Sequence, residues 1–254
     1  MRESQLKKAQ HFGDVEQVEQ LKREIEQLRL YEFHHVSGFD HPQLPIVVTD
    51  AERFKIATWG LIPNWMKDLK SGMQFSNKTL NARSETIFEK NTFKDAAIHQ
   101  RCLIIVDGFY EHHHAMKKTF PYYIYLKSKA PMILAGLWNN WKDKSNGNDL
   151  NTFTIVTTKG NSLLEEIHNN PKMAAARMPV ILTPELGHKW LEIDASDKAG
   201  QDEILSLCKP YDAKLMEAHT VKPIRGKVAI GNISEANQKH DYPELIAFNQ
   251  SKLF

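Results

Sequence analysis

Three segments of the sequence carry side chains that suit nucleic-acid contacts or proton transfer. The first places Trp65 in a turn after Pro63, with Asn81 and Arg83 further along the chain. An aromatic side chain on a loop offers a flat face for a base, and such stacking is worth about 1–3 kcal/mol per base. On an extended backbone, Asn81 and Arg83 point to the same side. An amide and a guanidinium on one face suit phosphate or base-edge contacts, and equally a structural ion pair with Glu85.

The second segment, DGFYE, ends at Glu111 and follows an apolar run directly. An acidic residue at a strand end beside aromatic residues is a candidate general acid or base, although solvated glutamates are commoner there. His112, His113 and His114 come next. Adjacent strand residues alternate between faces, so these three cannot bind one ion, and no cysteine or acidic partner has the usual metal spacing. We therefore expect solvated histidines and no metal.

The third segment joins His168 to Arg177 through a loop. His168 ends a predicted helix that begins near Ser162, where a charged histidine is favoured by the helix dipole. A histidine is also a proton donor near neutral pH, so a catalytic interpretation remains open beside the structural one. None of the three segments identifies a function by itself.

The composition and net charge of the chain indicate which classes of protein it can belong to. The 254 residues are 41% hydrophobic and 25% charged, which is ordinary for a folded globular protein. A net charge of +2 does not indicate a nucleic-acid binder, so any DNA contact needs a local basic and aromatic cluster. No apolar run approaches the roughly 20 residues of a membrane helix, and the polar N-terminus predicts no export signal. Two cysteines, Cys102 and Cys208, are typical of a reducing cytoplasm, where we expect the protein.

The elements that must position these side chains are predicted from the apolar spacing. Short runs rich in β-branched and aromatic residues predict strands, and a helical period predicts helices. Many strands with few intervening helices favour an α+β fold with a mixed, mostly antiparallel, barrel-like sheet and peripheral helices. The polar stretch 142–151 predicts a hairpin-like loop. The strands are expected at 46–49, 54–59, 102–106, 122–126, 132–137 and 153–157, and the helices at 14–29, 92–99, 162–168, 184–191 and 201–207.

We expect residues 1–254 to form a single domain, because no repeat, low-complexity tract or linker divides the chain. Residues 1–30 form its N-terminal segment, with an amphipathic helix over 14–29 that packs on the body. A coiled coil is the alternative for that helix, but two heptads are fewer than the three or four that a coiled coil requires.

Taken together and in order, the motifs resemble the signature blocks of the SOS response-associated peptidase family, which processes abasic sites. The resemblance spans the chain from about residue 33 to the mid-230s and includes closing segments at 219–221 and 229–232. It implies a compact β-rich fold with a positively charged groove that holds kinked single-stranded DNA. The blocks are WGLIPNW, NARSETI, RCLIIVDGFYE, AGLW, TFTIVTT and the pair IH and RMPVIL.

The resemblance also implies a reaction. In that family a cysteine follows the initiator methionine, and its amine and thiol condense with the ring-opened aldehyde of an abasic site to give a thiazolidine. Glu111 then corresponds to the glutamate that handles protons on the amine, and His168 to the histidine that assists sugar ring opening. Asn81 corresponds to the asparagine that holds the N-terminal residue and the lesion. The DNA-binding set implied is Trp65 for base stacking, Arg83 and Arg177 for the backbone, and Ser37, near a position where the family usually has asparagine.

The sequence departs from the family at the nucleophile. Position 2 is Arg2, and the first cysteine is Cys102, in an apolar run where burial makes a thiol inert. His112 stands where the family usually has tryptophan. We expect the reading frame to continue upstream to a Met-Cys pair, and peptidase (hydrolase) or lyase-like crosslinking activity only with that cysteine.

The expected partner is single-stranded DNA containing abasic sites, bound by a monomer that needs no cofactor or metal and that associates with the nucleoid when on DNA. Two alternatives remain: a non-catalytic single-stranded DNA-binding module, and a peptidase that acts on other proteins.

Overall fold

A computed structural model of the chain describes Glu19 and residues 33–49, 54–171 and 173–251. The chain divides into two compact units, Met1–Phe33 and His34–Phe254, and every strand described belongs to the second. Apart from Glu19, the helix expected over 14–29 lies outside the described residues. Within the described ranges, no helix is both long enough and apolar enough to cross a membrane.

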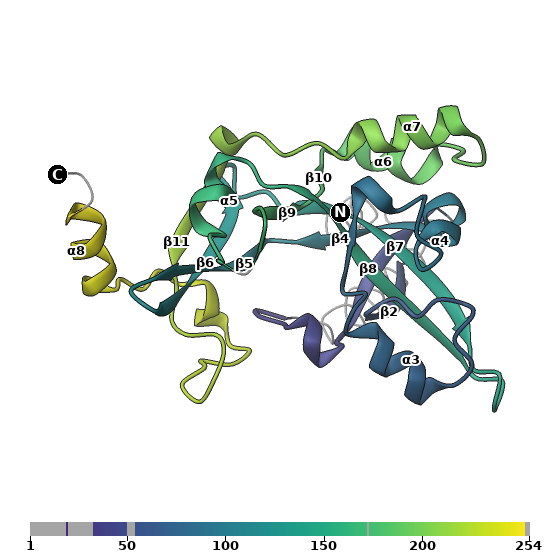
Figure 1. The fold of residues 1–254 in the computed structure, drawn as a ribbon, viewed down its shortest axis with the longest axis horizontal. Coiled ribbons are helices and arrows are strands. Elements are labelled where there is room, and N and C mark those ends of the chain that lie inside the picture. Colours follow the sequence, from purple (N-terminus) through teal and green to yellow (C-terminus); the bar gives the residue numbers. More distant parts are fainter. Residues whose placement is uncertain (1–18, 20–32, 50–53, 172, 252–254) are drawn as a thin grey trace. The chain divides into compact units, whose positions relative to one another are not determined.

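Five strands form a closed, barrel-like circuit (Figure 1). Hydrogen bonding runs from β7 through β4, β1, β2 and β8 and returns to β7. Every neighbouring pair in the circuit is antiparallel except β2 and β8, so the expected α+β fold with a mixed, mostly antiparallel sheet is confirmed. The circuit consists of β1 (Gln43–Val48), β2 (Phe54–Trp59), β4 (Arg101–Val106), β7 (Met132–Lys142) and β8 (Asp149–Lys159).

Three short strands extend this sheet at its rim. β10 (Ile181–Leu182) adds to β7, while β3 (Asn81–Arg83) and β9 (Arg177–Pro179) both add to β8. β8 can serve so many partners because its eleven residues exceed the length that β7 and β2 cover. Its last residues are therefore free to pair with β3 on one side and β9 on the other.

A separate three-stranded antiparallel sheet carries Glu111. It is formed by β5 (Gly108–Ala115), β6 (Lys118–Leu126) and β11 (Met216–Thr220). Glu111 lies within β5 opposite Tyr122, so the prediction that it ends a strand was wrong. The chain bends at Asp107 and continues extended, because β6 supplies hydrogen-bond partners for residues that carry no apolar run of their own.

The helices lie around the sheets, and several begin at a residue whose side chain accepts a backbone N–H of the first turn. Such capping satisfies donors that the helix itself cannot. α6 and α7 lie close together over one end of the barrel (Figure 1). The four helices expected after residue 90 are confirmed within about three residues at each end, a normal uncertainty for helix boundaries. The described helices are α3 (Leu69–Ser76), α4 (Lys94–His99), α5 (Ser162–Ile167), α6 (Pro184–Glu192), α7 (Lys198–Leu207) and α8 (Pro243–Ser251).

Two hydrophobic clusters hold these layers together. One lies between the barrel and the helices α4, α6 and α7, and contains the fully buried Trp190 and Ile204. The other joins the two sheets and α5, with Ile124 from β6, Phe153 from β8 and Ile167 from α5. Because α5 is anchored in the cluster between the sheets, the residue that follows it is held close to β5.

Candidate functional site

Glu111 and His168 meet between β5 and the end of α5. His168 is the C-cap residue of α5, and its backbone N–H donates to Leu164 O at 2.7 Å. Its Nδ1 lies 3.3 Å from Oε2 of Glu111, and the two side chains are only 11% and 27% exposed. The other oxygen of Glu111, Oε1, accepts the backbone N–H of His112 at 2.9 Å. One oxygen of the carboxylate is thus held by a backbone N–H, and the other faces the imidazole of His168.

The surroundings of the His168 ring determine where its hydrogen lies. Nδ1 faces two acceptors, Oε2 of Glu111 and the backbone oxygen of Arg177, each at 3.3 Å. Nε2 lies 3.0 Å from Sδ of Met173, a weak acceptor. Since the acceptors at Nδ1 are the stronger ones, a neutral ring is better satisfied with its hydrogen on Nδ1, and Nε2 is then the nitrogen that faces a bound ligand. This arrangement suits general acid or base catalysis at Nε2.

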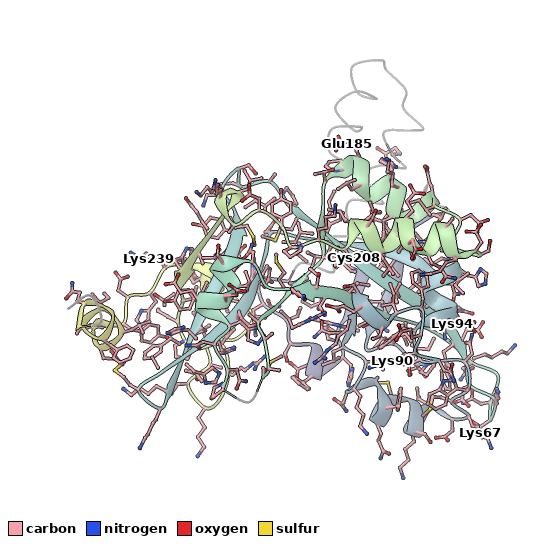
Figure 2. All side chains as sticks on the ribbon, turned by 45° about the horizontal axis from the view of Figure 1, so that its top comes forward. Lys67, Lys90, Lys94, Glu185, Cys208 and Lys239 are labelled. Carbon is pink, nitrogen blue, oxygen red and sulfur yellow. The ribbon has the colours of Figure 1, made fainter. Side chains whose placement is uncertain are left out.

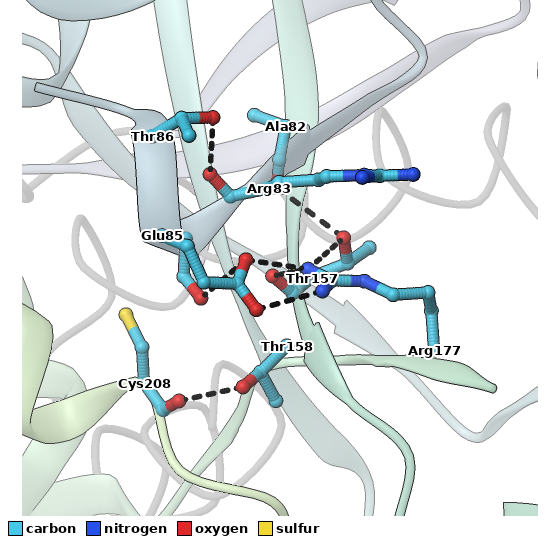
Figure 3. A network of polar contacts seen from close by, with 9 residues as sticks. Ala82, Arg83, Glu85, Thr86, Thr157, Thr158, Arg177 and Cys208 are labelled. Atoms are coloured by element: carbon cyan, nitrogen blue, oxygen red, sulfur yellow. Dashed lines mark hydrogen bonds and ion pairs between the residues drawn. The ribbon is translucent and has the colours of Figure 1, made fainter. Parts of the chain in front are cut away.

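The two Nη atoms of Arg177 are bound by its own protein (Figure 3), whereas its buried Nε has no hydrogen-bond partner among the described residues. Nη1 donates to Oε1 of Glu85 at 2.7 Å and Nη2 to Oε2 at 2.9 Å, while Nη2 also reaches the Thr157 carbonyl at 2.7 Å. This bidentate pairing lowers the pKa of Glu85 below its usual value. The structural alternative for Asn81 and Arg83 was an ion pair with Glu85, but Glu85 pairs with Arg177. The contact of Arg177 with a DNA backbone remains a prediction.

Asn81 and Arg83 lie on β3 with exposed side chains, on either side of the buried Ala82. Pairing with β8 keeps this segment extended, so the two polar side chains share one face as predicted. Among the residues that the structure describes, no hydrogen bond joins Asn81 to Glu111 or His168. The convergence of these three side chains therefore remains a prediction, whereas the Glu111–His168 contact is observed.

The two tryptophans of the first motif, Trp59 and Trp65, differ in exposure. Trp65 is 50% exposed and meets Phe75 edge to face at a centroid distance of 5.1 Å. Trp59 is partly buried against Phe153, and its Nε1 donates to Leu80 O at 2.8 Å. Ser37, assigned to the DNA-binding set, is partly buried, and its Oγ accepts the Phe39 N–H at 3.3 Å.

The three consecutive histidines are half-buried, so the prediction that they are solvated was wrong. Burial, with a contribution from nearby Arg225, lowers the pKa of His112 to about 4. Nδ1 of His113 lies 3.0 Å from Glu166 O, because α5 covers that face of β5. Within the described part of the chain, no group of three or more His, Cys, Asp or Glu side chains is arranged to hold a metal ion.

Neither cysteine has the character of a nucleophile. Cys102 is fully buried in β4, and burial raises the pKa of its thiol well above the usual value. Cys208, which follows α7 (Figures 2 and 3), is 8% exposed, and burial raises its pKa to about 12. A thiol must be ionised and accessible to react, so both are structural. The burial expected for Cys102 is confirmed.

Sequence patterns did not indicate the roles of Glu85 and Met173. Glu85 binds a residue 92 positions away, and Met173 contacts His168 from a loop with no periodic pattern. The two arginines of the motifs offered the only signal for Glu85, since a carboxylate close to arginines in sequence is a candidate ion-pair partner.

Comparison with known proteins identifies a family model, relatives in sequence and a similar solved structure. The family model described as SOS response associated peptidase (SRAP) matches residues 12–228. The abasic site processing protein YoqW of Bacillus subtilis is 41% identical over 189 residues, which cover 74% of this chain and 73% of that protein. An abasic site processing protein of Saccharomyces cerevisiae is 30% identical over 70% of this chain and 45% of its own length. A crystal structure of a protein from Bacteroides thetaiotaomicron superposes with a TM-score of 0.73 at 34% identity, covering 83% of this chain and 86% of that chain.

Proposed function

The chain belongs to the SOS response associated peptidase family, and from this premise we propose that it processes abasic sites in DNA as part of a DNA-damage response. The observation that carries the proposal is the contact between Glu111 and His168 at 3.3 Å. Abasic-site chemistry is a series of proton transfers around an aldehyde, and a half-sequestered carboxylate–imidazole pair is suited to them.

We propose a covalent route for a form of the protein that carries a cysteine after its initiator methionine. The free α-amine adds to the aldehyde carbon and water leaves, which gives an imine. The thiol then adds to the imine carbon, its proton passes to the nitrogen, and a thiazolidine closes. One water is released and no oxidant is required. Glu111 accepts a proton from the amine, and His168 takes up a proton at Nε2 and then gives it to the departing oxygen.

The same proposal gives Trp65 and Arg83 the task of holding single-stranded DNA. Trp65 offers an exposed indole face, and Arg83 an exposed guanidinium on the strand next to β8. Arg177 is occupied by Glu85, so the first phosphate contact belongs to Arg83 rather than to Arg177. We extend the proposal to a single domain that binds DNA as a monomer.

We expect Arg83→Ala to weaken single-stranded DNA binding by roughly tenfold on every sequence, since phosphate contacts carry no base information. The slope of log affinity against log salt should fall by about one unit, as the loss of one phosphate contact requires. Fluorescence anisotropy with unmodified oligonucleotides at several salt concentrations measures both. Lys90→Ala, on an exposed turn before α4, is the control. An unchanged salt slope in Arg83→Ala would contradict the assignment.

A purely reversible DNA-binding module is the second candidate, favoured by the burial of both cysteines. An oligonucleotide with one abasic site separates the two functions. We expect an adduct that survives denaturation when the cysteine is present, and only a reversible shift when it is absent. No binding in either form would reject both candidates.

A further inference from the structure

Arg177 belongs to two contacts at once, one through its side chain and one through its backbone. The guanidinium is fixed by Glu85 and by the carbonyl of Thr157, as Figure 3 shows. The backbone oxygen of the same residue lies 3.3 Å from Nδ1 of His168. Whatever holds the Arg177 side chain therefore also holds an acceptor against the imidazole.

The backbone at this point lies at the end of a short strand, where the Ala176 carbonyl accepts the Gly160 N–H at 2.9 Å and the side chain of Met178 is buried. Arg177 is the first residue of β9, which pairs with β8 over only three residues and follows the loop after His168. A short strand end is expected to fray unless a side chain fastens it. The fastening is strong here, because a bidentate arginine–carboxylate pair fixes both distance and orientation. The Arg177 side chain is only 16% exposed, so water competes weakly for it.

Glu85 provides that fastening from a different part of the fold. It lies in the 3-10 turn η2 (Ser84–Thr86), directly after β3. β3 and β9 both pair with the end of β8, so Glu85 reaches Arg177 across the strand that separates them. In this way the motif that carries Asn81 and Arg83 is tied to the loop that follows His168.

We propose that Glu85 is a positioning residue for His168: its carboxylate fixes the Arg177 side chain, and so keeps the Arg177 carbonyl against Nδ1 and the hydrogen of the neutral ring on that nitrogen. Nε2 is then left unprotonated and able to accept a proton. The importance of this for catalysis rests on the proposed function, but the positioning itself is a property of the protein without DNA.

Near neutral pH the ion pair between Glu85 and Arg177 is intact. Because Arg177 lowers the pKa of Glu85, the carboxylate stays charged and its contribution to stability is complete above the ordinary glutamate value. That contribution is lost as the pH falls through the lowered pKa. The charged or titratable neighbours of this carboxylate are Arg177 from β9 and Cys208 beyond α7, whose pKa is far above neutrality. An experiment at pH 7 therefore examines the protein with this ion pair formed.

Nitrogen NMR of the histidine rings in the full chain tests the proposal. The His168 signals are assigned by their loss in His168→Gln. We expect the neutral ring of the unaltered protein to carry its hydrogen on Nδ1. In Glu85→Gln the shift difference between Nδ1 and Nε2 should fall to about half, as the ring exchanges between tautomers. Arg177→Lys should reduce this shift difference in the same way, since an ammonium group cannot form the bidentate pair with Glu85.

The matched control is Glu244→Gln. Glu244 pairs with Lys118 at 3.3 Å and is 41% exposed, close to the 43% of Glu85, but it lies on α8. This variant should leave the His168 signals unchanged. The proposal is overturned if folded Glu85→Gln and Arg177→Lys both keep the original His168 tautomer, or if Glu244→Gln alters it equally. Thermal melting establishes that the variants are folded.

The outcome is separable from that of the proposed function. If the His168 tautomer responds to Glu85→Gln but no abasic-site adduct forms in any version of the protein, the positioning stands and the proposed chemistry fails. If the adduct forms while the tautomer is insensitive to both variants, the chemistry stands and the positioning role fails. Tighter binding of unmodified DNA by Glu85→Gln with an unchanged tautomer would instead show that Glu85 masks Arg177 from phosphate.

Discussion

In a version of the protein that carries a cysteine after the initiator methionine, replacing Glu111 with glutamine should slow abasic-site crosslinking about a hundredfold, within the usual range for loss of a general acid or base. Glutamine keeps the size of the side chain and the acceptor for the His112 N–H, but its amide cannot take up a proton. The affinity for unmodified DNA should stay within about twofold, because Glu111 contacts no phosphate in this proposal. Initial rates of adduct formation on denaturing gels, compared with anisotropy, measure the two effects.

His168→Gln, alone and combined with Glu111→Gln, tests whether the two side chains act together. If Glu111 and His168 share one proton path, the double variant should be about as slow as the slower single variant, since residues that act as a unit are not additive. Glu165→Gln is the control, because Glu165 is an exposed carboxylate on the helix that His168 ends. Multiplicative losses in the double variant would mean that the two side chains act separately, and an unimpaired Glu111→Gln would remove Glu111 from the mechanism.

The strands that the sequence predicted are those with apolar residues on both faces. β4 and β8 are largely buried, and β4 is a continuous apolar run, whereas β8 combines apolar residues with threonines, which are also typical of strands. β5 was missed because its side chains are tyrosine, glutamate and histidine, and its place in a sheet is determined by the hydrogen bonds of β6. Partial burial of such residues depends on what α5 places over them, and no local pattern records that.

The candidate site, like the fold, could be predicted from the sequence only in part. The family resemblance selected Glu111 and His168 as residues, and the structure brings them to 3.3 Å. Spacing in the sequence contained no information on that distance, because α5 and β5 are far apart in the chain and are brought together by the cluster between the two sheets and by the contact of His113 with Glu166. The pairing of Arg177 with Glu85 was missed for a related reason. A motif arginine was assigned to DNA from its position, while the carboxylate that binds it lies beyond β3.

The largest expected effect on stability comes from Trp190. The indole is fully buried in α6, and its Nε1 donates to Cys102 O at 3.1 Å and to Gly136 O at 3.3 Å. Trp190→Ala should therefore lower the free energy of unfolding by about 3–5 kcal/mol, through lost burial and a cavity between α6 and the barrel. At roughly 2–4 °C per kcal/mol for a domain of this size, the Tm should fall by about 6–20 °C. Chemical denaturation followed by circular dichroism measures the loss.

Trp65→Ala is the matched control, since it removes the same side chain from a site where half of it is already in water. Its cost should stay within about 1 kcal/mol, although it should weaken DNA binding. Trp190 belongs to the cluster with α4, α6 and α7, whereas α5 and its C-cap His168 belong to the cluster between the sheets. Any loss of DNA chemistry in Trp190→Ala should therefore follow the unfolded fraction and disappear on cooling to a temperature where the variant is folded. Similar losses of stability in the two tryptophan variants would contradict the burial that distinguishes them, and a chemical defect in fully folded Trp190→Ala would show that the two clusters are coupled.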